Sequence, residues 1–348
     1  MDLQIAAILL QDGMANGAIY TMLALGFVLV FTTTRIIFAS YGDLIALSAL
    51  TLHALQNGRL PGTVSLVAIL AVFATTVECW SLMRAGKLRR VPRAILIWLI
   101  IPVLPVAGCL LLQDHLSHAA QIALTVALVM PIAPLLYRLV FQPIERASTL
   151  TLLIVALVLH YVIAGFALLT FGAEGVRTAG AVSGSVELLG VSVGLQVIAF
   201  VSVAALFSTG LALFFRFTMA GKALRATAYN SAGASLVGIS TRGSAVFAFL
   251  LAGVIAAIVG ILIGPTITIY YDSGLMIGLK GFVGAVLGGF VSYPLAALGS
   301  VIVGLVEAYA SFFASSFKEI IVFLSIIPIV LLRWMGTQHH VEEEEEPA

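Results

Sequence analysis

Long apolar runs fill most of this chain, and only short polar stretches separate them. Each run approaches the roughly 20 residues of a helix that crosses a bilayer, and none alternates with the period of a membrane-spanning strand. A soluble fold is excluded because 61% of the residues are hydrophobic and only 9% are charged, whereas soluble domains carry about 25% charged residues. We therefore expect an all-α polytopic membrane protein with about 9–11 transmembrane helices embedded in the lipid bilayer.

The apolar runs define the expected transmembrane helices. Their approximate bounds are 13–34, 43–57, 63–83, 94–112, 120–141, 150–171, 194–215, 243–264, 275–291, 294–315 and 319–333. The second and ninth of these are shorter than a straight span needs, so we expect broken or re-entrant helices there. Residues 1–335 are expected to form one transmembrane domain, and 336–348 a disordered acidic tail on the cytoplasmic side.

The distribution of basic residues orients the spans. The loops 84–93, 142–149 and 216–242 hold most of the basic residues between spans, and all three fall on one side of the membrane. Short cytoplasmic loops are enriched in Lys and Arg, so this side is cytoplasmic. The N-terminus is then expected outside, without a cleaved signal peptide. On the outer side, the loop 172–190 is rich in Gly, Ser and Val and is expected to form a small hairpin or short strands against the outer face.

The longest ordered polar stretch is the loop 216–242, which contains no acidic residue. Its first part is composed of strong helix formers, and Lys222 and Arg225 fall on one helix face. Asn230 is expected to end this helix or cap the next one, which contains Ala234 and closes at Gly238. The abundance of Ala and Gly, including Gly221, allows close approach of a partner. The loop is therefore a candidate docking element, and a purely structural loop is the alternative.

Ionisable residues within apolar runs are expensive in a membrane and mark candidate functional sites. Asp43 opens one run, Lys280 lies among glycines, and Glu307 lies in a later run. Capping of a helix N-terminus is an alternative role for Asp43. For Lys280, structural pairing and lining of a pathway are both open, and Glu307 is its candidate partner across two packed helices. Glu78 is expected to extend to the membrane interface.

A polar break, Phe-Ala-Ser-Tyr-Gly-Asp, interrupts the apolar pattern at residues 38–43. Irregular backbone at membrane depth needs cover from protein or from a water-filled cavity, and transport sites often lie at such breaks. Asn16 and Tyr20 precede it and share one helix face. With Tyr41 and Asp43 they join Lys280 and Glu307 as candidates for a substrate pathway. A simple cytoplasmic turn is the alternative explanation of the break.

Glycine pairs spaced four residues apart occur at 13/17, 260/264, 274/278 and 284/288. In membranes, small residues at this spacing let helix backbones approach closely. Packing within the chain is the first expectation. An interface with another membrane subunit and lining of a pathway are the alternatives.

Several classes of function lack their sequence patterns. The Gly-Lys pairs at 86–87 and 221–222 lack the flanking residues of a phosphate-binding loop, so no ATP site is expected. The chain has no serine-hydrolase pattern and no clustered Cys/His set, so we expect neither an enzyme nor a metal site. Cys79 and Cys109 are expected to be free thiols. No dense basic patch with interleaved aromatics supports nucleic-acid binding.

Four colinear stretches, 16–43, 135–148, 219–240 and 278–308, resemble the permeases of ABC importers for branched-chain amino acids, of the high-affinity leucine/isoleucine/valine type. The matching residues in the last two stretches are Gly221, Lys222, Arg225, Ala226, Asn230, Ala234, Gly238, Ile239, Lys280, Gly288, Gly289, Ser292, Gly299, Gly304 and Glu307. Three features depart from the family's pattern. Tyr41 stands where a histidine is usual, and Gln142 where an arginine is usual. Residues 62–112 resemble an inserted two-span hairpin, whose even number of spans leaves the downstream topology unchanged.

The resemblance implies a permease subunit in a bacterial inner membrane. Its implied partners are a second, homologous permease, two cytoplasmic ABC ATPase subunits and a periplasmic solute-binding protein. The loop 216–242 would dock the ATPases, which would bind ATP and magnesium, while this chain itself would hold no cofactor. Branched-chain or other small hydrophobic amino acids are the implied cargo. Alternatives are the same machine importing urea, short amides or aromatic and other organic acids, and a stand-alone secondary transporter or channel.

Overall fold

The structure, a computed structural model, describes residues 3–112, 117–180, 184–188, 191–290, 292–328 and 331. Within these residues, eight helices are long and apolar enough to cross a membrane. They are Ile5–Thr34, Thr63–Arg84, Leu88–Leu111, His118–Ile144, Thr149–Phe171, Leu195–Phe217, Thr241–Ile263 and Tyr293–Phe313. This architecture confirms the predicted all-α polytopic class.

Polar caps determine where many of the helices begin. A side-chain oxygen just before the helix accepts a hydrogen bond from the backbone N–H three residues further on. This bond satisfies a donor that has no partner within the first turn. The capping residues are Ser117, Ser148, Thr218, Asn230, Ser240 and Ser292. These helix starts therefore follow from the local sequence.

Two apolar helices are shorter than a straight span, as predicted. Helix α2, Tyr41–Gln56, has 16 residues, and α13, Ser273–Leu287, has 15. The final predicted span, 319–333, is described only in part. Its helix α15 covers Lys318–Leu324, and the predicted acidic tail 336–348 lies outside the described residues.

The chain divides into two compact units. The first unit comprises Met1–Val28, Val182–Thr209 and Lys280–Ala348, and the second comprises Leu29–Ala181 and Gly210–Leu279. Helices α1, α9 and α13 contribute residues to both. The expectation of a single domain over 1–335 stays a prediction.

The first unit combines membrane-length helices with a short hairpin. Its elements are most of α1 (Leu3–Thr34), β1 (Ser185–Leu188), β2 (Val191–Gly194), most of α9 (Leu195–Phe217), the end of α13, α14 (Tyr293–Phe313), η6 (Ser315–Phe317) and α15. Strands β1 and β2 pair antiparallel, with Val186 opposite Val193. The predicted hairpin therefore begins within the outer loop, and its second strand lies beyond the predicted bounds of 172–190.

Glycines hold α1 against α14 in the first unit. A Cβ added at Gly13 would lie 2.9 Å from Leu305 Cα, and one at Gly17 would lie 2.8 Å from Val301 Cα. Gly284 of α13 and Gly288, which directly follows that helix, abut α14 in the same way, at Ser300 and Ala296. The two glycine pairs in this unit therefore serve packing within the chain, which was the first expectation.

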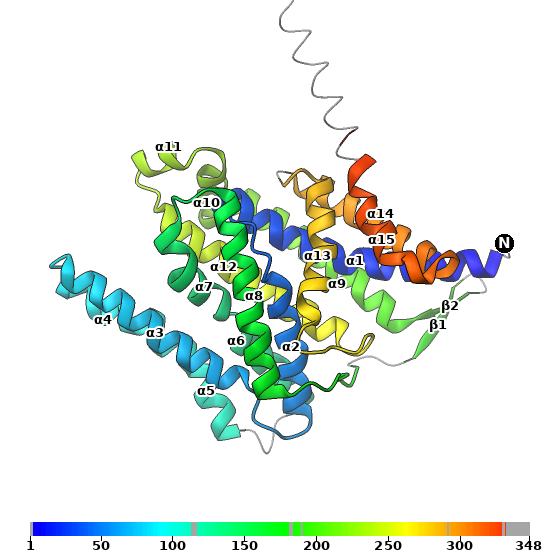
Figure 1. Ribbon diagram of the computed structural model, residues 1–348, viewed down its shortest axis with the longest axis horizontal. Coiled ribbons are helices and arrows are strands. Elements are labelled where there is room, and N and C mark those ends of the chain that lie inside the picture. Colours follow the sequence, from blue (N-terminus) through cyan, green and yellow to red (C-terminus); the bar gives the residue numbers. More distant parts are fainter. Residues whose placement is uncertain are drawn as a thin grey trace, which may run out of the picture. The chain divides into compact units, whose positions relative to one another are not determined.

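The second unit contains the remaining helices (Figure 1). Besides α2, the elements not yet given are α3 (Thr63–Arg84), η1 (Leu88–Arg90), α4 (Val91–Ile95), η2 (Leu96–Ile100), α5 (Ile101–Leu112), α6 (His118–Val129), α7 (Ile132–Leu136), η4 (Tyr137–Phe141), η5 (Gln142–Ile144), α8 (Thr149–Phe171), α10 (Met219–Tyr229), α11 (Ser231–Leu236) and α12 (Thr241–Ile263). Helix α2 packs along α12 and against α6. Ser48 Oγ on α2 donates to Ala257 O on α12 at 2.7 Å, beside Gly260, where a Cβ would meet Ser48 at 2.5 Å.

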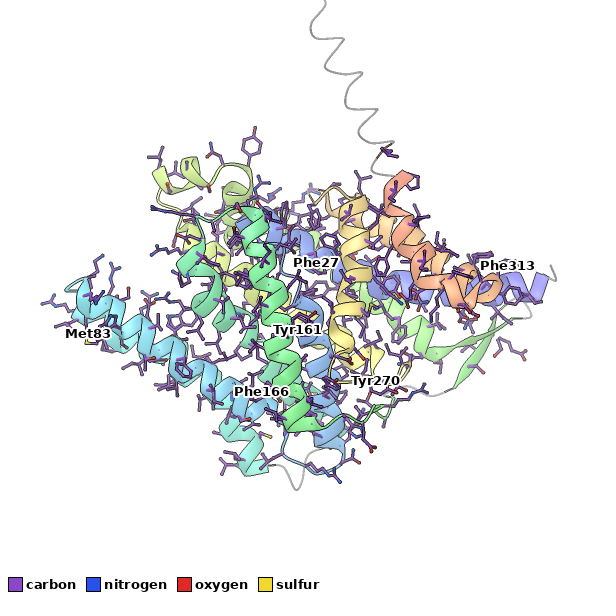
Figure 2. The ribbon with its side chains drawn as sticks, in the orientation of Figure 1. Phe27, Met83, Tyr161, Phe166, Tyr270 and Phe313 are labelled. Carbon is purple, nitrogen blue, oxygen red and sulfur yellow. The ribbon has the colours of Figure 1, made fainter. Side chains whose placement is uncertain are left out.

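The region 62–112 forms a helical hairpin, in which α3 packs against α4, η2 and α5 (cyan in Figure 1). Its apolar side chains are largely exposed, including Met83, which Figure 2 labels near the end of α3. Glu78 on α3 accepts a hydrogen bond from Arg138 Nε at 2.7 Å, and Arg138 Nη2 lies 2.5 Å from the same carboxylate oxygen. Glu78 therefore has an ion-pair partner within the protein, and its extension to the membrane interface stays a prediction.

Candidate functional site

The loop between α9 and α12 forms the predicted pair of short helices. Asn230 ends α10, and its Oδ1 accepts a hydrogen bond from Gly233 N at 2.9 Å, so it caps α11. Gly238 follows α11 with a φ of 85°, a left-handed conformation that favours glycine. Ile239 N donates to Ala234 O at 3.0 Å, which closes the helix end. We call residues 219–238 the docking loop.

Two contacts attach the docking loop to the helices on either side. Gly221 lies against the end of α9, where a Cβ would meet the Phe214 carbonyl and would approach Phe215 Cα to 2.7 Å. Thr227 Oγ1 and Ser244 Oγ, the latter on α12, are 3.1 Å apart in a buried hydrogen bond. The side chain of Ala234 is buried as well. The loop is therefore held to α9 and α12 rather than hanging free between them.

The outer face of the docking loop is basic and apolar. Lys222 and Arg225 are exposed, and within the described part of the chain neither forms an ion pair. Large apolar side chains on the same loop are also exposed: Met219 by 81%, Tyr229 by 94%, Leu236 by 88% and Val237 by 75%. The sequence interpretation emphasised the small residues and missed these four, although large apolar residues in a polar loop were a readable signal. Exposed apolar groups outside the membrane mark a surface for a partner.

The polar break at 38–43 is buried inside the second unit. Phe38 contacts Phe141 and Phe249 at ring-centroid distances of 5.7 and 5.1 Å, and Tyr137 stacks near Phe249 at 4.9 Å. Tyr41 is fully buried beside them. The alternative of a simple turn at the cytoplasmic surface is therefore wrong, because such a turn would be exposed.

A buried aspartate–histidine pair lies at the end of this break. Asp43 Oδ1 accepts a hydrogen bond from His160 Nδ1 on α8 at 2.8 Å, and both side chains are at least nine-tenths buried. Ser40 occupies the N-cap position of α2, but its side chain makes no capping hydrogen bond. Asp43 makes no such bond either. The capping role considered for Asp43 is therefore wrong. Its second oxygen, Oδ2, has no hydrogen-bond partner among the described residues.

Glycines bring α13 against this pair. A Cβ at Gly274 would meet the Asp43 side chain and would lie 2.5 Å from its Cα. A Cβ at Gly42 would collide with the Gly274 carbonyl and would lie 2.7 Å from Gly278 N. The 274/278 pair thus packs within the chain, and the backbone of α13 contacts the start of α2, which carries the buried Asp43 carboxylate.

A second buried polar cluster lies in the first unit. Lys280 Nζ lies 2.5 Å from Glu307 Oε1 and 3.2 Å from Glu319 Oε1. The Tyr20 hydroxyl donates to the other Glu307 oxygen. The predicted Lys280–Glu307 pair is therefore confirmed, and Tyr20 joins it. Asn16 is half-buried one turn earlier on α1.

The predicted pathway residues thus form two groups, one in each unit. Tyr20, Lys280 and Glu307 are in contact in the first unit, and Asp43 with Tyr41 lies at the break in the second. The sequence interpretation missed two of their partners, His160 and Glu319. A histidine inside an apolar span was a usable signal, because ionisable groups there are rare. Glu319 sits at the start of a short helix and gave no comparable signal.

Comparison with known proteins gives a family match that covers most of the chain. Residues 9–332 match the family described as the permease component of the branched-chain amino acid transport system. The chain is 29% identical to the high-affinity branched-chain amino acid transport system permease protein LivH of Salmonella typhimurium over 215 residues, 60% of this chain and 70% of LivH. It is 28% identical to LivH of Escherichia coli K12 over 220 residues, again 60% of this chain and 70% of that protein.

A third relative is the permease protein BraD of Pseudomonas aeruginosa, of the same transport system. It is 32% identical over 153 residues, which cover 43% of this chain and 50% of BraD. No solved structure matches the chain significantly. Because the family match extends over nearly the whole length and agrees with the multi-pass helical fold, this chain belongs to the family of permease components of branched-chain amino acid transport systems.

Proposed function

We propose that this chain is the membrane-spanning permease subunit of an ATP-driven ABC importer in a bacterial inner membrane. Its proposed cargo is branched-chain or other small hydrophobic amino acids. The observation that carries the proposal is the docking loop, which joins a basic face to four large exposed apolar side chains in a member of this permease family. Such a surface needs a partner outside the membrane, and an ATPase subunit supplies one.

The attachments of the docking loop suggest how an ATPase moves the helices. A partner that grips the exposed face pulls on α10, which is fixed to α9 at Gly221 and to α12 through the Thr227–Ser244 hydrogen bond. Helix α12 in turn packs along α2, whose start carries the Asp43–His160 pair. Movement of the loop therefore reaches the polar break without passing through a flexible linker. Switching between outward and inward access is a shift between two such arrangements.

The proposed assembly contains a second permease subunit, two ATPase subunits and an external solute-binding protein. ATP and magnesium belong to the ATPase subunits, and this chain binds no cofactor and catalyses no hydrolysis. In the permease, the Tyr20–Glu307–Lys280 group and the Tyr41–Asp43 group are proposed to face the cargo or to support the residues that do, with Asn16 beside the first group.

Uptake by the reconstituted importer tests the proposal. The permease, its partner permease and the ATPases are placed in proteoliposomes, and radiolabelled leucine is supplied with the cognate binding protein outside and ATP inside. ATP-dependent accumulation of leucine is the expected result. Uptake that persists without the ATPases indicates a stand-alone carrier and contradicts the proposal. Uptake of urea, an amide or an aromatic acid in place of leucine keeps the machine but changes the cargo.

A further inference from the structure

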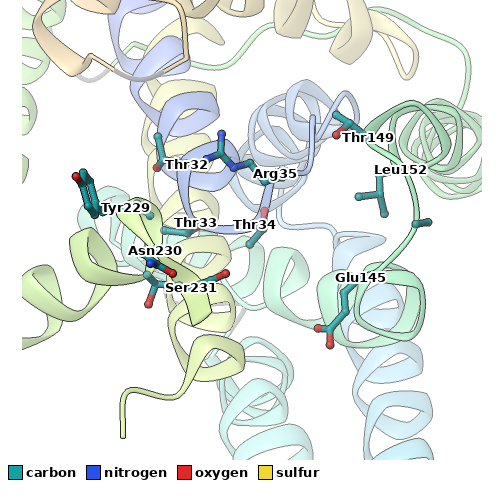
Figure 3. A pocket seen from close by; sticks show the side chains of 13 residues that line it. Thr32, Thr33, Thr34, Arg35, Glu145, Thr149, Leu152, Tyr229, Asn230 and Ser231 are labelled. Atoms are coloured by element: carbon teal, nitrogen blue, oxygen red, sulfur yellow. The ribbon is translucent and has the colours of Figure 1, made fainter. Parts of the chain in front are cut away.

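A cavity of about 530 Å³ lies in the second unit, and residues of the docking loop form part of its lining (Figure 3). Three segments meet there: the end of α1, the stretch that leads into α8, and the turn between α10 and α11. The volume falls within the range of small-molecule sites, about 300–1,000 Å³. Neither the family match nor any role described above assigns an occupant to it.

One side of the cavity carries a positive charge without a counterion. Arg35 is exposed and forms no ion pair within the described residues; its guanidinium lies 5.8 Å from the centre of the Phe31 ring. The backbone of Arg35 has a φ of 59°, an uncommon conformation for a residue other than glycine. Thr149, at the first turn of the 23-residue helix α8, also lines the cavity. The partial positive charge of that helix end adds to the charge of Arg35.

A carboxylate lines a separate part of the same cavity. Glu145 is partly exposed, and Figure 3 shows it apart from Arg35. Its ion pair with Arg242 spans 3.5 Å between two exposed side chains, and such pairs contribute little and exchange readily. A simple anion would be attracted to Arg35 but repelled by Glu145. A ligand that carries both a carboxylate and an ammonium group satisfies both sides.

The remaining lining suits an α-amino acid with an apolar side chain. Threonines of the α1 end, such as Thr34, line the cavity, and Leu152 supplies a buried apolar wall. We propose that this cavity is a second amino-acid site. In it, Arg35 holds the α-carboxylate, Glu145 holds the α-ammonium group, and Leu152 contacts the side chain.

The position of the site gives it a regulatory consequence. Asn230 and Ser231 of the docking loop also line the cavity, so an occupant joins the loop to α1 and α8. This restrains the movement that the ATPases need to impose. The cavity lies on the side predicted to be cytoplasmic, where imported amino acid accumulates. The inference rests on the proposed function, which identifies the amino acid as the imported one. It adds that this amino acid, once accumulated in the cytoplasm, inhibits further import.

Binding to the full-length chain in nanodiscs tests the site independently of transport. L-leucine is compared with 4-methylpentanoate, which has only the carboxylate, and with isoamylamine, which has only the amine. We expect saturable leucine binding that Arg35→Gln and Glu145→Gln each weaken at least tenfold, and at least tenfold weaker binding of both analogues. Arg146→Gln is the matched control, because Arg146 neighbours Glu145 without lining the cavity. Glu145→Gln changes a partly exposed side chain, so its fold is expected to be intact, as elution and helicity will show.

Equal binding of 4-methylpentanoate and leucine would instead indicate an anion site, such as one for an acidic side chain of a partner, and would overturn the proposal. Leucine binding that is absent, or insensitive to both variants, overturns it as well. In proteoliposomes, leucine preloaded on the ATP side should slow ATP-driven uptake for the parent chain and less so for Glu145→Gln. Absence of any leucine uptake alongside intact, variant-sensitive binding contradicts the importer function but not the site.

Discussion

The docking loop and the two buried polar clusters depart from the usual distribution of side chains in opposite ways. The clusters place charged groups inside the protein, and the loop places large apolar groups outside it. In the clusters, most of the unusual groups find partners within this chain. In the loop, Met219, Tyr229 and Leu236 gain no burial in the described structure.

The clusters are expected to affect the folding stability of this chain, and the docking loop its assembly with other proteins. A buried charge that loses its partner penalises folding directly. An exposed apolar side chain contributes little to folding, and its effect appears only when another protein covers it. Substitutions in the clusters should therefore change the stability of this chain, and substitutions in the loop should change its complexes.

The largest expected effect is at Lys280. Replacement by Met leaves Glu307 and Glu319 without their shared cation, and removal of one member of a buried ion pair costs about 3–5 kcal/mol. We expect a strongly reduced yield of folded protein in detergent and a lower midpoint of thermal unfolding. Lys222→Met, which changes an exposed lysine in the docking loop, is the matched control. Equal stability of the two variants would show that the first-unit cluster is not structural.

A smaller effect is expected at His160. Replacement by Phe leaves Asp43 with two unpaired oxygens in a buried site, at a cost of about 1–3 kcal/mol. Asp43→Asn in the same background removes the unpaired charge and should restore part of the loss. The measurement is a double-mutant cycle of thermal unfolding. Strictly additive changes would mean that the two side chains are not coupled.

The pair Glu78–Arg138 should matter less, because Glu78 is partly exposed. Glu78→Ala leaves the buried Arg138 without this carboxylate and is expected to destabilise the attachment of α3 by about 1.5 kcal/mol. Hydrogen exchange should accelerate in α3, while α12 stays protected. Faster hydrogen exchange throughout the chain would instead mean that the Glu78–Arg138 pair stabilises the whole fold rather than the attachment of α3.

The smallest effect on stability is expected in the docking loop. Tyr229→Ser and Leu236→Ser change side chains that are almost fully exposed, so the unfolding free energy should stay within about 0.5 kcal/mol of the parent. Thermal unfolding of the isolated chain checks this directly. A large loss of stability would mean that these side chains pack within the chain and would remove the contrast with the buried clusters.

Local signals made the docking loop predictable from sequence. Asn230 and Gly238 mark the ends of two short helices. Asn230 caps the start of α11, and Gly238 adopts a left-handed conformation after its end. The Lys280–Glu307 pair was predictable for a different reason, since rare charges in apolar spans need each other.

The remaining contacts depend on distant segments. Asp43 and His160 are 117 positions apart, and Glu78 and Arg138 are 60 apart. Nothing near either residue in the sequence specifies which helix will lie opposite. The cavity at Arg35 likewise needs three segments to meet. Hydrophobic periodicity predicts where helices form, but it does not predict which polar side chains meet where two helices pack.

The affinity of an ATPase subunit for the permease tests the central claim most directly. The dissociation constant is measured for the parent chain in nanodiscs and for the double variant Tyr229→Ser/Leu236→Ser. Arg89→Glu, a charge reversal on an exposed residue at the tip of the 62–112 hairpin, serves as the control. We expect at least tenfold weaker binding for the double variant and unchanged binding for the control. Unchanged binding of the double variant would contradict the assignment of residues 219–238 as the docking loop.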